Sequence, residues 1–190
     1  MRQKIQALLM FAALLTTSVV FAADTYTIDP AHTSFTFTVK HMMISNVPGE
    51  FDKFSGTITY DPKDLASSSA NISIDVNSIN TRIDRRDAHL KSPDFFDAAK
   101  FPAITFVSTK FTPGFITGNF TMKSVTKVIT IPVTISGPVD EMGHQAIGLT
   151  GSTTINRQDY GVNWNKTLDK GGVAVSDDVN VNISIEADQK

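Results

Sequence analysis

The feature that most constrains the fold of this chain is a repeated alternation of apolar and polar residues. Along residues 34–41, the apolar Phe35, Phe37 and Val39 alternate with polar residues, and segments 71–77 and 178–186 repeat the pattern. Because successive side chains of a strand point to opposite faces, this period predicts antiparallel strands with one buried face. Weaker alternation is found at 25–28, 54–60, 104–111, 115–122, 127–136 and 146–155. The chain is therefore predicted to form eight or nine strands.

The turns between these segments are short and rich in glycine and proline. Asp61-Pro62, Pro113-Gly114, Gly137-Pro138 and Gly171-Gly172 lie between the alternating runs, and such dipeptides mark turns. Short links favour strands that run up and down, each pairing with its neighbour in the sequence. With neither an internal repeat nor an interdomain linker, residues 23–190 are predicted as one domain, either a closed barrel or a sandwich.

The first 22 residues have the three-part form of a secretory signal peptide. Arg2 and Lys4 give a short basic start, residues 5–20 are uncharged and mostly apolar, and small residues suit cleavage after Ala22. This pattern is typical of export signals. An apolar stretch of roughly 18 residues could also span a bilayer, so an uncleaved anchor is the alternative. The short basic flank and the small residues favour cleavage, which predicts an exported protein without a stable membrane anchor.

Composition excludes several classes of function. The 190 residues include 17 basic and 19 acidic side chains, and without Arg2 and Lys4 the remaining 15 basic residues leave a net charge of −4. No run of basic residues is present, which argues against nucleic acid as a partner. The chain has no cysteine, so disulfides, thiol catalysis, thiolate zinc sites and iron–sulfur clusters are excluded.

One segment, residues 83–91, departs from the strand pattern. Ile83 and Leu90 are seven residues apart, with Arg86 and Asp87 between them on the same helical face. Ser92-Pro93 should end this helix, because the residue before a proline avoids the helical region. We predict a short helix over an open end of the barrel. There, Arg86 and Asp87 either form salt bridges that fix the helix to the barrel or meet a polar ligand group near the mouth.

The apolar strand positions are numerous and bulky enough to line the interior of a barrel. An eight-stranded antiparallel barrel can fill its interior with side chains or hold one apolar ligand, as lipocalins do. Periodicity alone does not distinguish a packed core from a cavity. The residues assigned to the apolar lining are Phe35, Phe37, Val39, Ile58, Ile72, Ile74, Val76, Ile104, Phe106, Phe120, Ile131, Val133, Leu149, Val181 and Ile183.

Several longer motifs resemble those of one known family. The segments that carry the resemblance are 29–41 (DPAHTSFTFTVKH), 49–51 (GEF), 54–56 (FSG), 78–81 (SINT), 86–96 (RDAHLKSPDFF), 101–109 (FPAITFVST) and 157–161 (RQDYG). They keep their order and cover nearly all of residues 23–190. On these motifs the chain is similar to the YceI-like family.

The resemblance implies an all-β fold, an antiparallel up-and-down eight-stranded lipocalin-like barrel with the short helix near its mouth. It further implies a long hydrophobic interior that holds a polyisoprenoid, an isoprenoid quinone or a similar amphiphile, often in a homodimer. Together with the signal peptide, the family points to the periplasm. One segment departs from the family pattern, because Met122 and Ser124 stand where the family has a Leu-Thr-like strand end and a glycine. This departure leaves the geometry of the 121–127 hairpin open.

The polar residues do not indicate a metal site. No two of the four histidines have a His-x-His or His-x₃-His spacing, so structural or solvent roles are favoured over metal binding. His41 has the inward parity of its strand, and it either bonds the backbone at the rim or contacts a ligand head group. The residues assigned to the polar mouth are His41, Arg86, Asp87 and Arg157.

The sequence has no motif typical of a catalytic site. It contains no Gly-x-Ser-x-Gly elbow, no serine, histidine and aspartate on suitable elements, and no glycine loop for phosphate. The leading hypothesis is a non-enzymatic periplasmic carrier that sequesters an isoprenoid lipid as its ligand, with no other cofactor. The alternatives are an enzyme or chaperone of isoprenoid quinone or lipid metabolism, and a packed stress-response domain without a ligand.

Overall fold

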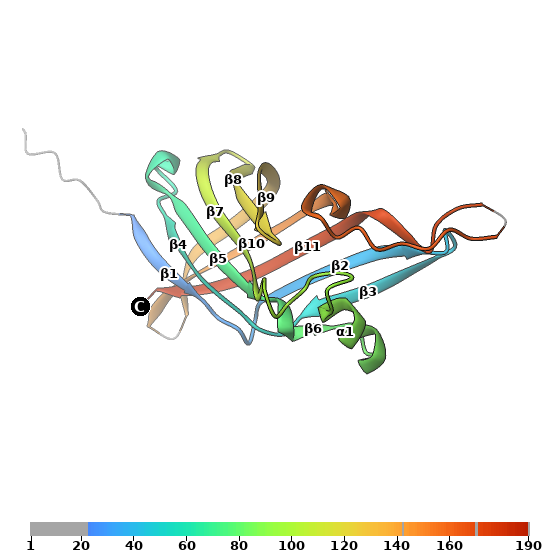
Figure 1. Cartoon of the computed structure of the whole chain (residues 1–190). Helices are drawn as coiled ribbons and strands as arrows, with labels where there is room; N and C mark the ends of the chain where they lie inside the picture. Colours follow the sequence, from blue (N-terminus) through green and yellow to red (C-terminus); the bar gives the residue numbers. More distant parts are fainter. Residues whose placement is uncertain (1–22, 142, 170, 190) are drawn as a thin grey trace, which may run out of the picture.

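The computed structural model describes residues 23–141, 143–169 and 171–189, so the predicted signal peptide, residues 1–22, lies outside the described residues. Strands make up most of the molecule (Figure 1). The strands are β1 (Asp24–Ile28), β2 (Ser34–His41), β3 (Ser45–Phe51), β4 (Phe54–Tyr60), β5 (Ser69–Asp75), β6 (Ile79–Asn80), β7 (Ala103–Thr112), β8 (Phe115–Met122), β9 (Val125–Glu141), β10 (His144–Asn156) and β11 (Val175–Gln189). The helices are α1 (Asp84–Lys91) and the short 3₁₀ helices η1 (Leu65–Ser67), η2 (Val76–Ser78) and η3 (Arg157–Tyr160).

The strands form a closed antiparallel barrel. The sheet runs in the order β1-β4-β5-β7-β8-β9-β10-β11, and β1 also pairs with β11, which closes the sheet on itself. Closure removes the free edges that an open sheet would expose along these strands. The predicted fold class, an eight-stranded antiparallel barrel, is confirmed.

Interrupted strands explain why eleven strands make an eight-membered barrel. β1 and β2 follow one another along the same partner, because Ile28 pairs with Ala187 of β11 and Ser34 pairs with Ser184 of β11. β3 and β4 likewise act as one interrupted strand of the barrel, and so do β5 and β6. Each of these interrupted strands pairs with its neighbour in the sequence, so the barrel runs up and down.

The helix α1 lies in the connection between β6 and β7, near one end of the barrel (Figure 1). Its N-cap is Ile83, whose backbone is still extended and whose side chain is 52% exposed. The prediction that Ile83 belongs to the inner face of the helix is therefore wrong, because the first helical turn begins after it. The helix ends at Lys91, as Ser92-Pro93 predicts. Within the described part of the chain, no helix combines the length and hydropathy needed to cross a membrane.

The hairpin between β8 and β9 forms without the glycine typical of the family. Lys123 and Ser124 have φ values of 47° and 63°, and positive φ at both positions of a two-residue turn matches the twist of the flanking strands. The Lys123 Nζ donates to the carbonyls of Phe95 at 2.6 Å and Gly161 at 3.0 Å. The turn thus ties two connecting segments to the end of the barrel.

Candidate functional site

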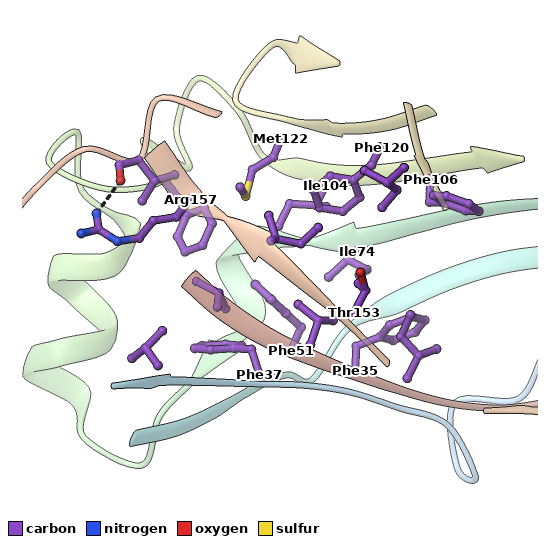
Figure 2. Close-up of a pocket in the computed structure, with 18 of the residues that line it drawn as sticks. Phe35, Phe37, Phe51, Ile74, Ile104, Phe106, Phe120, Met122, Thr153 and Arg157 are labelled. Atoms are coloured by element: carbon purple, nitrogen blue, oxygen red, sulfur yellow. Dashed lines mark hydrogen bonds between the residues drawn. The ribbon is translucent and has the colours of Figure 1, made fainter. Parts of the chain in front are cut away.

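A cavity of about 390 Å³ occupies the barrel interior (Figure 2). Its wall is built from inward-facing side chains of the strands, and it is closed on one side by α1 and the segments 92–101 and 161–174. The structure places thirteen of the fifteen residues predicted for the lining in this wall. They are Phe35, Phe37, Val39, Ile72, Ile74, Ile104, Phe106, Phe120, Ile131, Val133, Leu149, Val181 and Ile183.

The wall is apolar and incompletely packed. Phe37, Val39 and Ile74 face the interior, yet each remains only half-buried, and so do Phe120 and Val181. Protein interiors are packed with few voids larger than a water molecule. Inward-facing side chains that keep exposed surface therefore mark space that the chain itself does not fill.

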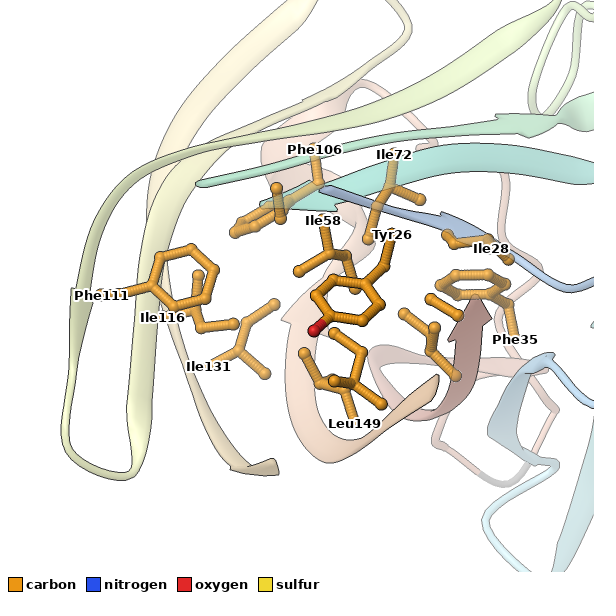
Figure 3. Close-up of a cluster of buried hydrophobic side chains, with 14 residues drawn as sticks. Tyr26, Ile28, Phe35, Ile58, Ile72, Phe106, Phe111, Ile116, Ile131 and Leu149 are labelled. Atoms are coloured by element: carbon orange, nitrogen blue, oxygen red, sulfur yellow. The ribbon is translucent and has the colours of Figure 1, made fainter. Parts of the chain in front are cut away.

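The floor of the cavity is a packed cluster at the end of the barrel where β1 pairs with β11 (Figure 3). At its centre, Tyr26 of β1 and Ile58 of β4 form a cross-strand pair and are 1% and 0% exposed. Phe35 and Leu149 belong both to this cluster and to the cavity wall. The cluster thus sets the depth to which a ligand can reach.

Two residues predicted for the lining do not lie in it. Ile58 is fully enclosed by the floor cluster. Val76 belongs to η2, because β5 ends at Asp75 and the Val76 N–H donates to the Pro102 carbonyl at 2.8 Å. Strand parity predicts correctly that the Ile58 side chain points inward, but it carries no information on whether the facing side chains meet.

Several aromatic residues of the wall are not predicted by the alternation of the strands. Phe51 of β3 contacts Phe37, with ring centroids 5.7 Å apart, and Phe96, at 6.2 Å. Phe95 and Trp164 come from the connections before β7 and before β11. Phe51, Phe95 and Phe96 lie within the motifs of the family resemblance, which could have pointed to them. Trp164 lies in a non-repetitive loop where no periodicity exists.

Three rings pack together at the side of the cavity near α1. His89, Phe95 and Trp164 have ring centroids 5.0 to 5.2 Å apart. A hydrogen bond of 2.8 Å joins His89 Nε2 to the carboxylate of Asp94, which fixes the orientation of the imidazole ring. This aromatic cluster gives the cavity a boundary that is apolar on its faces and polar at its edges.

Arg86 and Asp87 are joined through Thr81. Asp87 Oδ1 accepts from the N–H of Thr81 at 2.9 Å and from the Thr81 hydroxyl. Arg86 Nε donates to that hydroxyl at 2.7 Å, and Arg86 Nη2 donates to the Thr81 carbonyl at 2.6 Å. Within the described residues, no carboxylate oxygen lies within 4.0 Å of the Arg86 guanidinium. The alternative of salt bridges that fix the helix to the barrel is not found at Arg86, and hydrogen bonds to Thr81 hold both residues instead.

These bonds separate the roles of the two helix residues. Arg86 and Thr81 line the cavity, whereas Asp87 does not. Asp87, which was assigned to the polar mouth, is not among the lining residues, because its carboxylate accepts hydrogen bonds from Thr81 just before α1. Arg86 retains N–H groups for which the described residues offer no acceptor.

Arg157 is buried and clamps the loop before β11. Its side chain is 5% exposed and donates to the carbonyls of Val162 at 2.5 Å, Trp164 at 2.9 Å and Ser176 at 2.9 Å. A salt bridge of 3.2 Å joins it to Asp177. Burial lowers the pKa of the guanidinium, but an arginine stays charged. Arg157 lines the cavity, but its N–H groups donate to the carbonyls of this loop and not to a ligand.

Further polar residues also line the cavity. His41 lines it and is itself exposed, so the cavity meets solvent at the end of β2. Thr153 of β10 lies among the apolar side chains midway along the wall (Figure 2). These residues provide polar contacts at two depths of an otherwise apolar space.

A separate ion-pair cluster lies outside the cavity, where β1 passes into β2. His32 Nδ1 lies 2.6 Å from an oxygen of Asp29 and 3.2 Å from an oxygen of Glu186. The hydrogen bond to Asp29 and the charge of Glu186 raise the pKa of His32. The Asp29 pKa is lowered, first by a hydrogen bond from the Ala31 N–H and then by the bond to His32.

The spacing of histidines in the sequence did not reveal this cluster. Donor atoms of Asp29, His32 and Glu186 lie within 4.8 Å of one another, as do those of Glu141, Glu186 and Asp188. Glu186 enters from the last strand, so only the closure of the barrel brings it next to His32. Both groups lie at the surface, where such carboxylates also form ordinary ion pairs.

The protein is a closed antiparallel barrel with an apolar cavity beneath a short helix, which is the architecture of a lipocalin-like barrel. Within that class, the chain belongs to the YceI-like family, because the family's YceI-like domain matches residues 26–187. UPF0312 protein SAB2563 of Staphylococcus aureus is 40% identical over 165 residues, which cover 85% of this chain and 95% of that protein.

Two solved structures share the barrel. BcnA of Burkholderia cenocepacia has a TM-score of 0.73 and 28% sequence identity, over 84% of this chain and 99% of that chain. A polyisoprenoid binding domain from Saccharophagus degradans has a TM-score of 0.65 over 87% of this chain and 98% of that chain. At 18% sequence identity, this similarity shows that the two proteins share a fold and no more. The predicted family is confirmed.

Proposed function

We propose that this protein sequesters a long-chain isoprenoid lipid in its barrel, as a binding protein and not as an enzyme. The observation that carries the proposal is the apolar cavity of about 390 Å³, whose inward-facing side chains remain partly exposed. This volume falls within the roughly 300–1,000 Å³ of small-molecule sites. The polyisoprenoid binding domain from Saccharophagus degradans, which shares the fold, supports the choice of lipid class.

The energetics of such binding are favourable. A prenyl chain that buries several hundred Å² gains on the order of 10 kcal/mol at ~25 cal/mol/Å². Immobilising the chain and the protein side chains removes several kcal/mol of this. The balance supports tight binding that depends on the length of the chain more than on its exact structure.

We place the lipid head group at the mouth, near Arg86. The Arg86 guanidinium faces the cavity and keeps free N–H donors, so it suits an anionic or carbonyl-bearing head group. The packed floor around Tyr26 and Ile58 would stop the far end of the chain. The predicted export signal, residues 1–22, supports a periplasmic site of action, and intact-mass measurement of exported protein tests its removal.

Organic extraction of protein purified from its native compartment, followed by mass spectrometry, tests the proposal. We expect a prenyl lipid at near-stoichiometric amount, and its loss from a variant with Ile74→Trp in the cavity wall. A matched Val128→Trp variant, on the outer surface where Val128 is 67% exposed, should keep the lipid. Extracts without lipid, or chemical conversion of the lipid by the protein, would contradict a non-enzymatic lipid-binding role.

A further inference from the structure

We propose that the turn between β2 and β3 docks this protein on a lipid bilayer that carries anionic headgroups. The turn consists of Met42, Met43 and Ile44, which are 43%, 53% and 84% exposed. We call these three consecutive residues the Met42–Ile44 tip. Figure 1 shows that this turn and the loop before β11 project together beyond the body of the barrel.

The backbone of the turn favours residues other than those present. The Ile44 N–H donates to the His41 carbonyl at 3.1 Å, and φ is 50° at Met42 and 64° at Met43. Met42 and Met43 are the central residues of the four-residue turn 41–44, and a turn with positive φ at both central positions favours Asn and Gly there. This conformation is unfavourable for methionine. The fold therefore does not account for two methionines at this position.

The β8–β9 turn, in which two consecutive residues also have positive φ, has a structural reason for its sequence. At the β8–β9 turn, Lys123 also has positive φ, but its Nζ bonds to the carbonyls of Phe95 and Gly161. Met42 and Met43 instead leave about half of their side-chain surface in solvent. Exposed apolar side chains at the end of a projecting turn suit insertion into the interface of a bilayer.

Two basic side chains flank the tip and can contact anionic headgroups. Lys40 and Lys166 are both exposed, and neither has a carboxylate within 4.0 Å among the described residues. Hydrogen bonds of 2.9 Å from Met42 N–H to Ala174 and from Ala174 N–H to Lys166 tie the second loop to the tip. Asp169 and Asp178 are also exposed on the adjoining loop and strand, whereas Asp177 is paired with Arg157. Basic side chains near a membrane attract anionic lipids.

The tip is continuous with the cavity. Val39, His41, Val47 and Val175 line the cavity at the base of the same hairpin and of the adjoining strand. Val39 precedes Met42 by three residues, which is about 10 Å along a strand. Apolar groups at an interface insert by roughly 5–10 Å, so docking would hold the cavity mouth at headgroup level. At that level a lipid could pass from the membrane into the cavity. This step rests on the proposed function, whereas the docking itself does not.

The area of the tip argues against a second copy of the chain as its partner. A stable protein interface buries about 800 Å² on each partner. Three side chains on one turn offer much less than this. A membrane needs no matching surface, because the acyl boundary adapts to whatever inserts into it.

Flotation of the full exported protein with vesicles tests the proposal. We expect binding to vesicles of phosphatidylcholine with phosphatidylglycerol, weaker binding to phosphatidylcholine alone, and a decrease as salt is raised. The double substitution Met42→Asn and Met43→Gly should reduce partitioning by about tenfold or more. It should leave the thermal midpoint unchanged or higher, because it installs the favoured turn residues. Ile44→Ser should act in the same direction, whereas Val128→Ser, at an exposed position on β9, should have no effect.

The outcomes separate docking from lipid sequestration. Wild-type protein that fails to float, or tip variants that float as well as wild type, would overturn the proposal. A dimer that the double substitution dissociates would reassign the tip to self-association and would also overturn it. Lipid bound in the cavity is measured on the same samples. Its absence would remove the proposed function without changing the result of the vesicle experiment.

Discussion

Val39 and Val128 show how the position of one side chain decides its role. Both are β-branched residues in strands, but Val39 of β2 lines the cavity and Val128 of β9 is 67% exposed on the outer surface. The same chemical change at these two sites therefore has different consequences. A large side chain at Val39 enters the space that a ligand would fill.

We expect Val39→Trp to remove the bound lipid while the fold survives, because a cavity accepts added volume. In a packed core the same substitution typically costs 1–3 kcal/mol. Bound lipid by mass spectrometry and the thermal midpoint are measured together, with Val128→Trp as the control. A large fall in midpoint with unchanged lipid would mean that Val39 lies in a packed core.

His32 should make stability depend on pH. Its pKa is raised above 6.5 by Asp29 and Glu186, so its contribution is present at low pH and is lost as pH rises through the raised pKa. The Asp29 pKa is lowered below 3.8, so that contribution is lost only as pH falls through the lowered value.

We therefore expect His32→Gln to lower the thermal midpoint more at about pH 5.5 than at about pH 8.5. Titration of the His32 ring by NMR should give a midpoint above 6.5. Equal destabilisation at both pH values would show that the His32 charge does not contribute.

At the scale of elements, the mouth of the barrel is held by hydrogen bonds of a few polar side chains, with the Arg157–Asp177 salt bridge beside them. Thr81, next to β6, is hydrogen-bonded to Asp87 and Arg86 of α1. Arg157 donates hydrogen bonds to two carbonyls of the loop before β11. These segments contain the aromatic residues that close the cavity. Their position therefore depends on a few polar side chains near the mouth.

Arg157→Lys tests this arrangement. A lysine has one nitrogen and cannot reach the carbonyls of Val162, Trp164 and Ser176 together, so we expect a loss of about 2–3 kcal/mol in the free energy of unfolding. Urea denaturation measures the loss, and limited proteolysis should show faster cleavage within 161–174. Arg85→Lys, at an exposed position of α1, should leave both unchanged. Equal protease resistance in the Arg157 variant would disprove the clamp.

The whole molecule combines a packed end with a hollow end. The cluster around Tyr26 and Ile58 stabilises the barrel where it closes, while the opposite half leaves apolar side chains exposed to the cavity. A ligand that fills this space binds the folded state only. Stability and lipid occupancy should therefore be linked.

We expect delipidated protein to unfold at a lower temperature than protein reloaded with a prenyl lipid. Ligand at 100 times its Kd stabilises by about 2.7 kcal/mol, which corresponds to about 5–10 °C for a domain of this size. Calorimetry of the two forms measures the difference. Identical midpoints would contradict a lipid bound in the cavity, and a reductant should change neither midpoint because the chain has no cysteine.

Much of this fold could be predicted from local pattern. The alternation at 34–41 and 54–60 matches the bounds of β2 and β4, and α1 begins within one residue of its predicted start. β3 was missed, because Pro48 and Gly49 interrupt the alternation of Ser45–Phe51. Proline is tolerated there because that part of β3 pairs only with β2 among the described strands.

The sequence by itself determined which side chains face inward, since the pleat of a strand fixes this between neighbouring residues. Only the tertiary structure decided that Ile58 is enclosed while Val39 borders a cavity. It also decided that Glu186 forms an ion pair with His32 and that Asp87 accepts a hydrogen bond from Thr81. Packing and ion pairing depend on distances between residues that are remote in the chain. Those distances are set when the barrel closes, and no local pattern encodes them.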